Sequence, residues 1–171
     1  HGGRTEFVYP PCEQSSIEFA LERLGADSLD DCHIQMSCSR FGKPLSEVMD
    51  RILNDEGLEA FNEVCHAAAK IPDRDLDKFT AAVLYANANT SCEVCRIAES
   101  MELFEYAPGV RDTNNLGAWW LENKLDCSLP YEIDEFFDYE GYGESIAENN
   151  DGEFVEGLGF VCMEEGYTLE D

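Results

Sequence analysis

Two cysteines with two residues between them, Cys92 and Cys95, form the motif with the clearest chemical potential in this sequence. A C-x-x-C pair supports thiol redox chemistry when it lies at the start of a helix that follows a strand. A helix start is expected at Thr90, but the residues before it have helical spacing, so no strand is predicted there. A zinc site would need two further ligands. Cys65 and His66 are available, but Cys65 fits a buried position better, so we expect neither redox chemistry nor a metal.

The other side chains that commonly act in catalysis form no recognisable site. His1, His33 and His66 lie in none of the motifs that mark hydrolases or zinc peptidases. Asp134 and Asp138 could form an acid–base pair, but many carboxylates surround them and no basic residue nearby could orient a substrate. We therefore expect a protein that is not an enzyme and that uses no cofactor.

Acidic residues dominate the composition. Asp and Glu total 37 against 11 Lys and Arg, which gives a net charge of −26. Such a surface repels nucleic acid and anionic membranes, so the partner should be basic. Duplex DNA carries one charge per roughly 1.7 Å of axis, so this charge matches about 44 Å of duplex, or about 13 base pairs. A surface adapted to solubility or to high salt would give the same charge, so both explanations stay open.

Cysteine content and hydropathy indicate a cellular compartment. Eight cysteines are too few for a disulfide scaffold in a chain of 171 residues, and most of them adjoin apolar residues, as buried free thiols do. The sequence contains no secretory signal and no apolar stretch of membrane-spanning length. We expect a cytoplasmic protein with reduced thiols.

Residues 1–43 are predicted to form a small N-terminal α/β unit. Polar and apolar residues alternate along Arg4–Tyr9 and again along Cys32–Cys38, which predicts two strands. Between them, Ser15–Glu18 matches a capping box and opens a helix that should end at Gly25.

Residues 44–105 are predicted to form a helical middle domain, a small central bundle. Apolar residues recur at helical spacing in four stretches that short polar joints separate. A second capping box, Thr90 with Glu93, opens the last helix. The expected core positions of the first helix are Leu45, Val48, Met49, Ile52 and Leu53.

Residues 106–171 are predicted to form an acidic C-terminal α+β domain. A helix should open at Asp112, a second should cover residues 131–140, and a hairpin should cover Glu153–Met163. From Leu129 onward there are 14 acidic residues and no Lys or Arg. The predicted fold class is therefore α+β, with the three units in an elongated arrangement that keeps like charges apart.

The segment over residues 131–140 is the most informative one. Helical spacing would place Ile133, Phe136 and Phe137 on one side, with acidic residues on the others. Like charges four residues apart destabilise a helix by a few tenths of a kcal/mol per pair. Such crowding is either tolerated for solubility or kept for a basic partner.

This segment resembles the ArdA family of antirestriction proteins. The family pattern is a Pro-Glu opening followed by an aromatic, Asp-Tyr-Glu-Ala-Tyr-Gly core, and here Gly141 replaces the usual Ala. The resemblance extends from about Glu6 to Val161, and its first unit lacks the further strand with which the family begins, so that unit is expected to be incomplete. The matching segments are Leu129–Glu132, Phe136–Gly143, Gly152–Phe154 and Gly159–Val161.

The resemblance implies a dimer, encoded on a mobile element, that occupies the DNA-binding groove of type I restriction–modification enzymes and blocks DNA without catalysis. Phe136, Phe137 and Tyr142 would form the dimer interface, or alternatively the core of their own domain. The alternative function is an acidic interaction module for another basic DNA-binding or defence protein. The carboxylates expected to imitate phosphates are Glu132, Asp134, Glu135, Asp138, Glu140, Glu144, Glu148, Asp73, Asp75 and Asp77.

Overall fold

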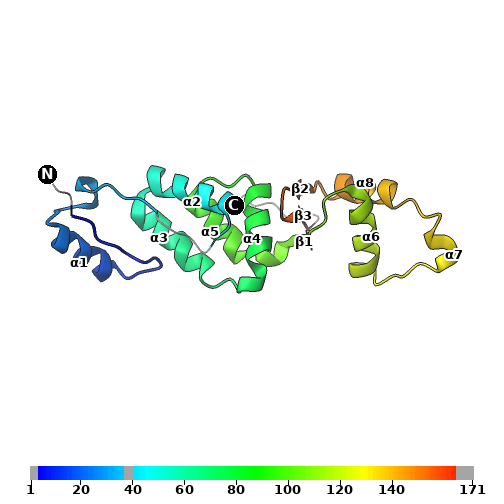
Figure 1. Cartoon of the computed structure of the whole chain (residues 1–171), viewed down its shortest axis with the longest axis horizontal. Coiled ribbons are helices and arrows are strands. Elements are labelled where there is room, and N and C mark those ends of the chain that lie inside the picture. The colour runs from blue at the N-terminus through cyan, green and yellow to red at the C-terminus, as the bar shows by residue number, and fades with distance from the viewer. Residues whose placement is uncertain (1–3, 37–40, 165–171) are drawn as a thin grey trace.

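The computed structural model describes residues 4–36 and 41–164; along its longest axis α1 (Gln14–Leu24) lies near one end and α7 (Tyr131–Asp134) at the other, from which the chain returns to the middle (Figure 1). These described residues hold eight α-helices and one three-stranded antiparallel sheet, so the fold is mixed α+β and dominated by helices. Among the described helices, none combines the length and the apolar character that crossing a membrane requires. His1 and the last two residues of the predicted strand Cys32–Cys38 lie outside the described residues.

The N-terminal unit consists of one α-helix and one short 3₁₀ turn. Helix α1 spans Gln14–Leu24, and Gly25 ends it in the left-handed conformation (φ 73°), which glycine adopts without steric cost. The turn η1 spans Leu29–Asp31. The predicted helix and its end are confirmed. The predicted capping box is wrong, because the N-cap is Glu13 and its side chain makes no capping hydrogen bond.

The two strands predicted in this unit are wrong for every residue that the structure describes. Arg4–Tyr9 and residues 32–36 have irregular conformation, and neither segment joins the sheet. Burial follows the sequence pattern along residues 32–36, where His33 and Gln35 are exposed, but not along the first segment, where Phe7 and Tyr9 are exposed. A strand also needs a hydrogen-bonding partner, and alternation within one segment cannot supply that partner. The described part of the predicted α/β unit is therefore helical and irregular.

Four helices form the central bundle and bury the predicted apolar stripes. All five core positions expected in the first of these helices are buried. The capping box at the last one is confirmed: the Thr90 hydroxyl accepts a hydrogen bond from the Glu93 N–H, and the Glu93 carboxylate accepts one from the Thr90 N–H. The helices are α2 (Lys43–Asp55), α3 (Gly57–Ala68), α4 (Leu76–Tyr85, after the turn η2, Asp73–Asp75) and α5 (Ser91–Glu99).

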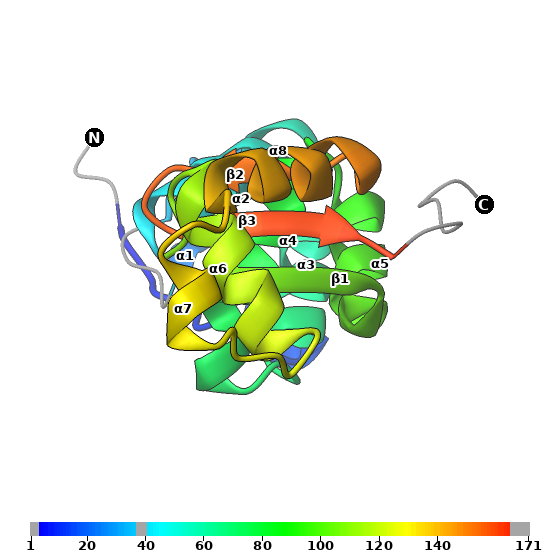
Figure 2. The same ribbon diagram turned by 90° about the vertical axis from the view of Figure 1, so that its right-hand side faces the viewer.

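The sheet joins the bundle to the C-terminal helices, and Figure 2 shows it from that end with α4 behind it. Its strands are β1 (Phe104–Pro108, after the turn η3, Met101–Leu103), β2 (Glu153–Val155) and β3 (Gly159–Met163). Strand β3 is central and antiparallel to both neighbours, so the predicted hairpin over residues 153–163 is confirmed.

The two faces of the central strand β3 pack against different cores. Phe104 and Val161 belong to the core of the bundle, whereas Phe160 and Cys162 belong to a second core on the opposite face. The predicted domain boundary between residues 105 and 106 falls inside β1, which contributes to both cores.

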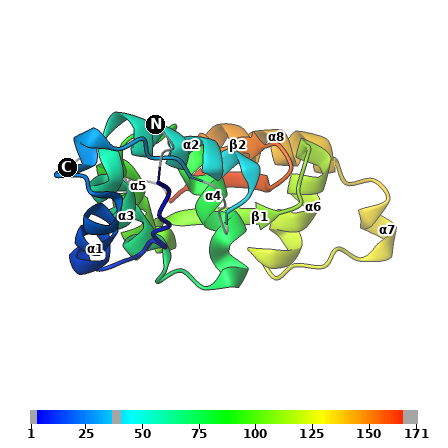
Figure 3. The same cartoon turned by 60° about the vertical axis from the view of Figure 1, so that its left-hand side comes forward.

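Three helices form the end of the molecule beyond the sheet (Figure 3). They are α6 (Thr113–Asn123), α7 (Tyr131–Asp134) and α8 (Tyr139–Asn149). The predicted start of α6 is confirmed, because the Asp112 carboxylate accepts a hydrogen bond of 2.8 Å from the Asn115 N–H. Helices α6 and α8 cross where Gly117 and Gly143 allow their backbones to touch, since a Cβ on either glycine would overlap the backbone of the other helix.

Candidate functional site

The C-terminal part of the structure carries a surface without positive charge. The described residues 125–164 contain twelve Asp or Glu and no Lys or Arg, and all twelve carboxylate side chains are exposed. Seven of them are among the predicted phosphate mimics. Sequence reasoning overlooked the other five, although the absence of Lys and Arg after position 124 signals them. We call the twelve the acidic surface: Asp126, Glu132, Asp134, Glu135, Asp138, Glu140, Glu144, Glu148, Asp151, Glu153, Glu156 and Glu164.

The continuous helix predicted over residues 131–140 is wrong, because the chain bends between α7 and α8. Asp138 has φ −81° and ψ 81°, and its carboxylate accepts a hydrogen bond of 2.9 Å from the Gly141 N–H, so it caps α8. The Tyr139 hydroxyl donates a hydrogen bond to the Asp134 carboxylate across the bend, and this bond raises the pKa of Tyr139. Two of the predicted phosphate mimics thus also have structural partners.

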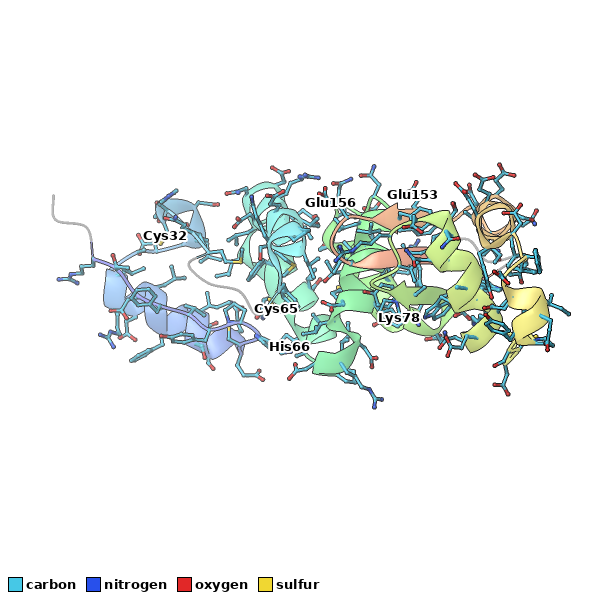
Figure 4. All side chains as sticks on the ribbon, turned by 45° about the vertical axis from the view of Figure 1, so that its right-hand side comes forward. Cys32, Cys65, His66, Lys78, Glu153 and Glu156 are labelled. Atoms are coloured by element: carbon cyan, nitrogen blue, oxygen red, sulfur yellow. The ribbon has the colours of Figure 1, made fainter. Side chains whose placement is uncertain are left out.

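Helix α8 presents a regular row of carboxylates. Glu140, Glu144 and Glu148 are spaced by four residues and are all exposed, so they lie along one face of the helix. Four residues of α-helix rise about 6 Å, whereas phosphates of one DNA strand recur every 3.4 Å along the axis. One row therefore has roughly half the charge density of a DNA strand, and neighbouring rows must add to it. Glu153 and Glu156, labelled at the hairpin in Figure 4, are further exposed carboxylates of the acidic surface.

The second predicted group of carboxylates lies apart from the acidic surface. Asp73 and Asp75 are in η2 and Asp77 is in the first turn of α4, within the bundle, whereas α7 lies at the far end of the molecule (Figure 1). Asp75 pairs with Arg74 at 3.5 Å. Asp77 adjoins Tyr106, whose pKa is raised by burial and by this negative charge. The structure therefore does not bring these three carboxylates together with the other seven.

An apolar patch lies within the acidic surface. Tyr131, Ile133 and Phe136 are 79%, 53% and 82% exposed, which is unusual for side chains of this size. Phe137 and Tyr142, the other residues of the predicted dimer interface, are half-buried, and their rings pack edge to face at 5.7 Å. Of the three predicted interface residues, Phe136 alone is well exposed.

Three of the thiols, those of Cys65, Cys95 and Cys162, have the properties of structural cysteines. Cys95 is half-buried, and its pKa is raised by burial and by the nearby carboxylates of Glu63 and Glu99. Burial likewise raises the pKa of Cys65 to about 12 and that of Cys162 to about 11. Thiol exchange requires the thiolate, which these shifts disfavour. Cys92 and Cys95 are both in α5, and none of the described residues before that helix forms a strand.

The described residues offer no metal centre. Cys65 and His66 are neighbours on α3 (Figure 4), but no group of three or more His, Cys, Asp or Glu in the described ranges could hold a metal ion. A hollow of about 600 Å³ between residues 6–12 and α1, and another of about 270 Å³ beside α4 and η3, open on the surface. No protein-family model and no curated protein matches the chain. Function must therefore be inferred from the chemistry of the surface.

Proposed function

We propose that this protein is an antirestriction protein that occupies the DNA-binding groove of a type I restriction–modification enzyme in place of DNA. The acidic surface carries this proposal, because twelve exposed carboxylates in a stretch of chain without Lys or Arg form a negative field that a basic partner would neutralise. The resemblance of the same segment to the ArdA family supports the choice of target. Inhibition would be competitive and would need no catalysis, no cofactor and no metal.

The elongated arrangement of the three predicted units is part of the proposal. Carboxylates imitate a duplex only if they are spread over a length comparable with a DNA site, and the net charge of −26 corresponds to about 44 Å of duplex. The succession of elements along the longest axis in Figure 1 supports this arrangement. A cytoplasmic protein encoded on a mobile element would meet the restriction enzyme where it acts.

The proposal includes a homodimer. Phe136 is the strongest candidate for the contact, because exposed aromatic side chains of this size commonly mark interfaces. Phe137 and Tyr142 would support the contact from beneath through their mutual ring packing. A dimer would double the length of charged surface presented to the groove.

The decisive experiment is a cleavage assay with a purified type I enzyme and the full chain. We expect inhibition near a one-to-one ratio that weakens as salt rises from 0.1 to 1 M, because the screening length falls from about 10 Å to about 3 Å. Inhibition that is catalytic in this protein, or indifferent to salt, would overturn the proposal. Binding to a different basic DNA-handling protein, with no effect on the type I enzyme, would favour the interaction-module alternative.

A pair of matched variants tests the site itself. The first variant leaves Asp134 and Asp138 unchanged, because these two have structural partners. It changes five other carboxylates of the acidic surface to Gln: Glu132, Glu135, Glu140, Glu144 and Glu148. The second makes the same change of net charge elsewhere, at Glu13, Glu18, Glu22, Glu59 and Glu99, all of them exposed. Each exposed pair contributes up to about 1 kcal/mol, so the first variant should lose more than tenfold in inhibition. Equal losses in both variants would show that net charge alone matters and would refute a localised site.

A further inference from the structure

One cation lies where the chain enters the acidic surface. Lys124 is the only Lys or Arg in the sequence after Arg111, and it is the C-cap residue of α6. Its ammonium group forms an ion pair with the carboxylate of Glu105 on β1, which is not part of the acidic surface. The two side chains are 30% and 28% exposed, so water and salt screen their attraction less than that of an exposed pair.

An aromatic ring gives the Lys124 side chain a second contact. Its Nζ atom lies 5.9 Å from the centroid of the Trp120 ring, a distance at which the face of an indole attracts a cation. The Trp120 ring in turn packs edge to face on Phe160 of the central strand β3, with the two centroids 6.5 Å apart. Lys124 therefore contacts both a ring of its own helix and a carboxylate of β1, and these contacts hold the end of α6 on the sheet.

The end of α6 also sets the direction in which the chain continues. The Leu125 N–H donates a hydrogen bond of 3.2 Å to the Trp120 carbonyl, and the Cys127 N–H donates one of 2.9 Å to the Leu121 carbonyl. Residues 125–127 are thus attached to the helical turn that Lys124 fastens. The chain then leads to the acidic tip, by which we mean residues 131–138: α7 and the bend that follows it.

Repulsion between carboxylates opposes a fixed position of the acidic tip. Its four acidic side chains are all exposed, and like charges held close together favour any movement that separates them. Polar contacts at the two ends of this segment resist such movement. At the end next to α8, the Tyr139 hydroxyl bonds to the Asp134 carboxylate. At the end next to α6, the resisting contact is the ion pair of Lys124 with Glu105.

We propose that Lys124 is a positioning residue, which through its ion pair with Glu105 holds the acidic tip in the direction that binding to a basic groove requires. The pair also keeps the ammonium group away from the acidic surface, where it would neutralise a carboxylate. The binding consequence rests on the proposed function. The effect on the position of the tip does not, because it arises from contacts within one chain.

Charge and position predict opposite effects for the loss of Lys124, so one substitution separates them. Lys124→Met keeps a side chain of similar length and removes one positive charge from a chain of net charge −26. If charge alone mattered, this variant would inhibit the type I enzyme more strongly than the wild type. We expect about tenfold weaker inhibition instead, because a tip that moves loses the preorganisation on which affinity depends. Lys124→Arg keeps the cation and should inhibit like the wild type.

Residual dipolar couplings of backbone amides, measured by NMR on the full chain, test the position of the tip without any partner. One alignment should fit the bundle and residues 131–138 together in the wild type and in Lys124→Arg. In Lys124→Met, and in Glu105→Gln, the couplings of residues 131–138 should shrink because the tip reorients. Unchanged couplings of the bundle and of β3 show that these variants are folded. Full couplings of the tip in both variants would overturn the proposal.

Lys43→Met is the matched control. It removes the same charge from a lysine whose side chain is 90% exposed and whose partner, Glu47, is 3.9 Å away, so neither the couplings nor the inhibition should weaken.

The two proposals fail in different ways. A wild-type chain that does not inhibit the type I enzyme would refute the antirestriction proposal. The positioning role would still stand if the tip reoriented in Lys124→Met and stayed fixed in Lys124→Arg. Where the wild type does inhibit, inhibition by Lys124→Met that equals or exceeds it would refute the positioning role alone.

Discussion

At the scale of single residues, the thiols separate into two reactivity classes. Cys92 and Cys127 are exposed, whereas Cys65 and Cys162 are buried and have pKa values raised to about 12 and about 11. Brief alkylation with iodoacetamide at pH 8, read by peptide mass spectrometry, should therefore modify the first pair and spare the second. Modification of Cys65 at the rate of Cys92 would contradict the buried position.

The same pKa shifts give the stability of the protein a defined pH dependence. The folded state holds these two thiols in the neutral form more strongly than the unfolded chain, whose thiols titrate near 9. Their contribution to the free energy of unfolding is complete below pH 9 and is lost as pH rises toward 11 to 12. Urea unfolding between pH 8 and 11 should show this decline, and the Cys65→Val/Cys162→Ala variant should show a smaller one.

The structural role of Asp138, as the N-cap of α8, can be tested separately from its negative charge. Asp138→Ala removes the cap of α8 and should lower the free energy of unfolding by about 1 kcal/mol. Asp138→Asn removes the charge but keeps a capping oxygen, so its stability should stay near that of the wild type. Glu140→Gln, on an uncapped exposed position of the same helix, is the control and should change stability by less than about 0.5 kcal/mol. Urea unfolding measures all three.

Cap residues also show what the sequence can and cannot predict at this scale. Thr90 with Glu93 satisfies both halves of a capping box, and the structure confirms it. Ser15 with Glu18 has the same spacing, but helix α1 begins at Gln14 and leaves Ser15 inside the first turn. The helical spacing around Asp138 predicts only a surface carboxylate, because it gives no sign of the bend between α7 and α8. An Asp followed by Glu140 in a first turn is the signal that could have revealed it.

At the scale of elements, the crossing of α6 and α8 should be the most sensitive contact of the C-terminal region. A methyl group at Gly143 would overlap the Thr113 carbonyl, so Gly143→Ala should lower the free energy of unfolding by about 1–3 kcal/mol. Ala118→Ser adds an atom on the exposed side of α6 and should be nearly neutral. Thermal unfolding of both variants checks the difference. A stable Gly143→Ala variant would mean that the two helices can separate at no cost.

Helices were predictable from the sequence because the apolar period of a helix depends on its own residues and needs no partner segment. The stripe Leu45 to Leu53 is buried as expected, because a 3.6-residue period can satisfy only a helix. Residues 32–36 have an equally clear two-residue period but form no strand, since strand formation depends on a partner elsewhere. The hairpin over residues 153–163 carries its partner in its own sequence and was predictable for that reason. The pairing of β1 with β3 spans more than fifty residues, and no local pattern indicates it.

At the scale of the whole molecule, charge should affect folding and binding with opposite signs. Salt screens the self-repulsion of a chain with net charge −26, so the melting temperature should rise between 0.1 and 1 M NaCl. The same screening should weaken binding to a basic groove. Calorimetry on the wild type and on the variant with five Glu→Gln changes in the acidic surface measures the rise in melting temperature with salt. This rise should be smaller in the variant. A melting temperature that falls with salt would show that specific ion pairs outweigh the repulsion.

The register of β1 and β3 brings together the two points at which the chain leaves and re-enters the sheet on either side of the acidic end. Pro108 lies opposite Gly159, and the Gly109 N–H donates a hydrogen bond of 2.8 Å to the Leu158 carbonyl, so the polypeptide leaves and re-enters the sheet at one point. The residues between them form one long connection whose two ends are held together by the paired strands β1 and β3. Near the end of this connection, the Asp151 carbonyl accepts a hydrogen bond from the Tyr85 hydroxyl and Val155 packs against the core of the bundle, so the stretch before Asp151 is the part that can change without loss of these two contacts. Evolution, or a protein engineer, could thereby retune the negatively charged end while keeping the scaffold.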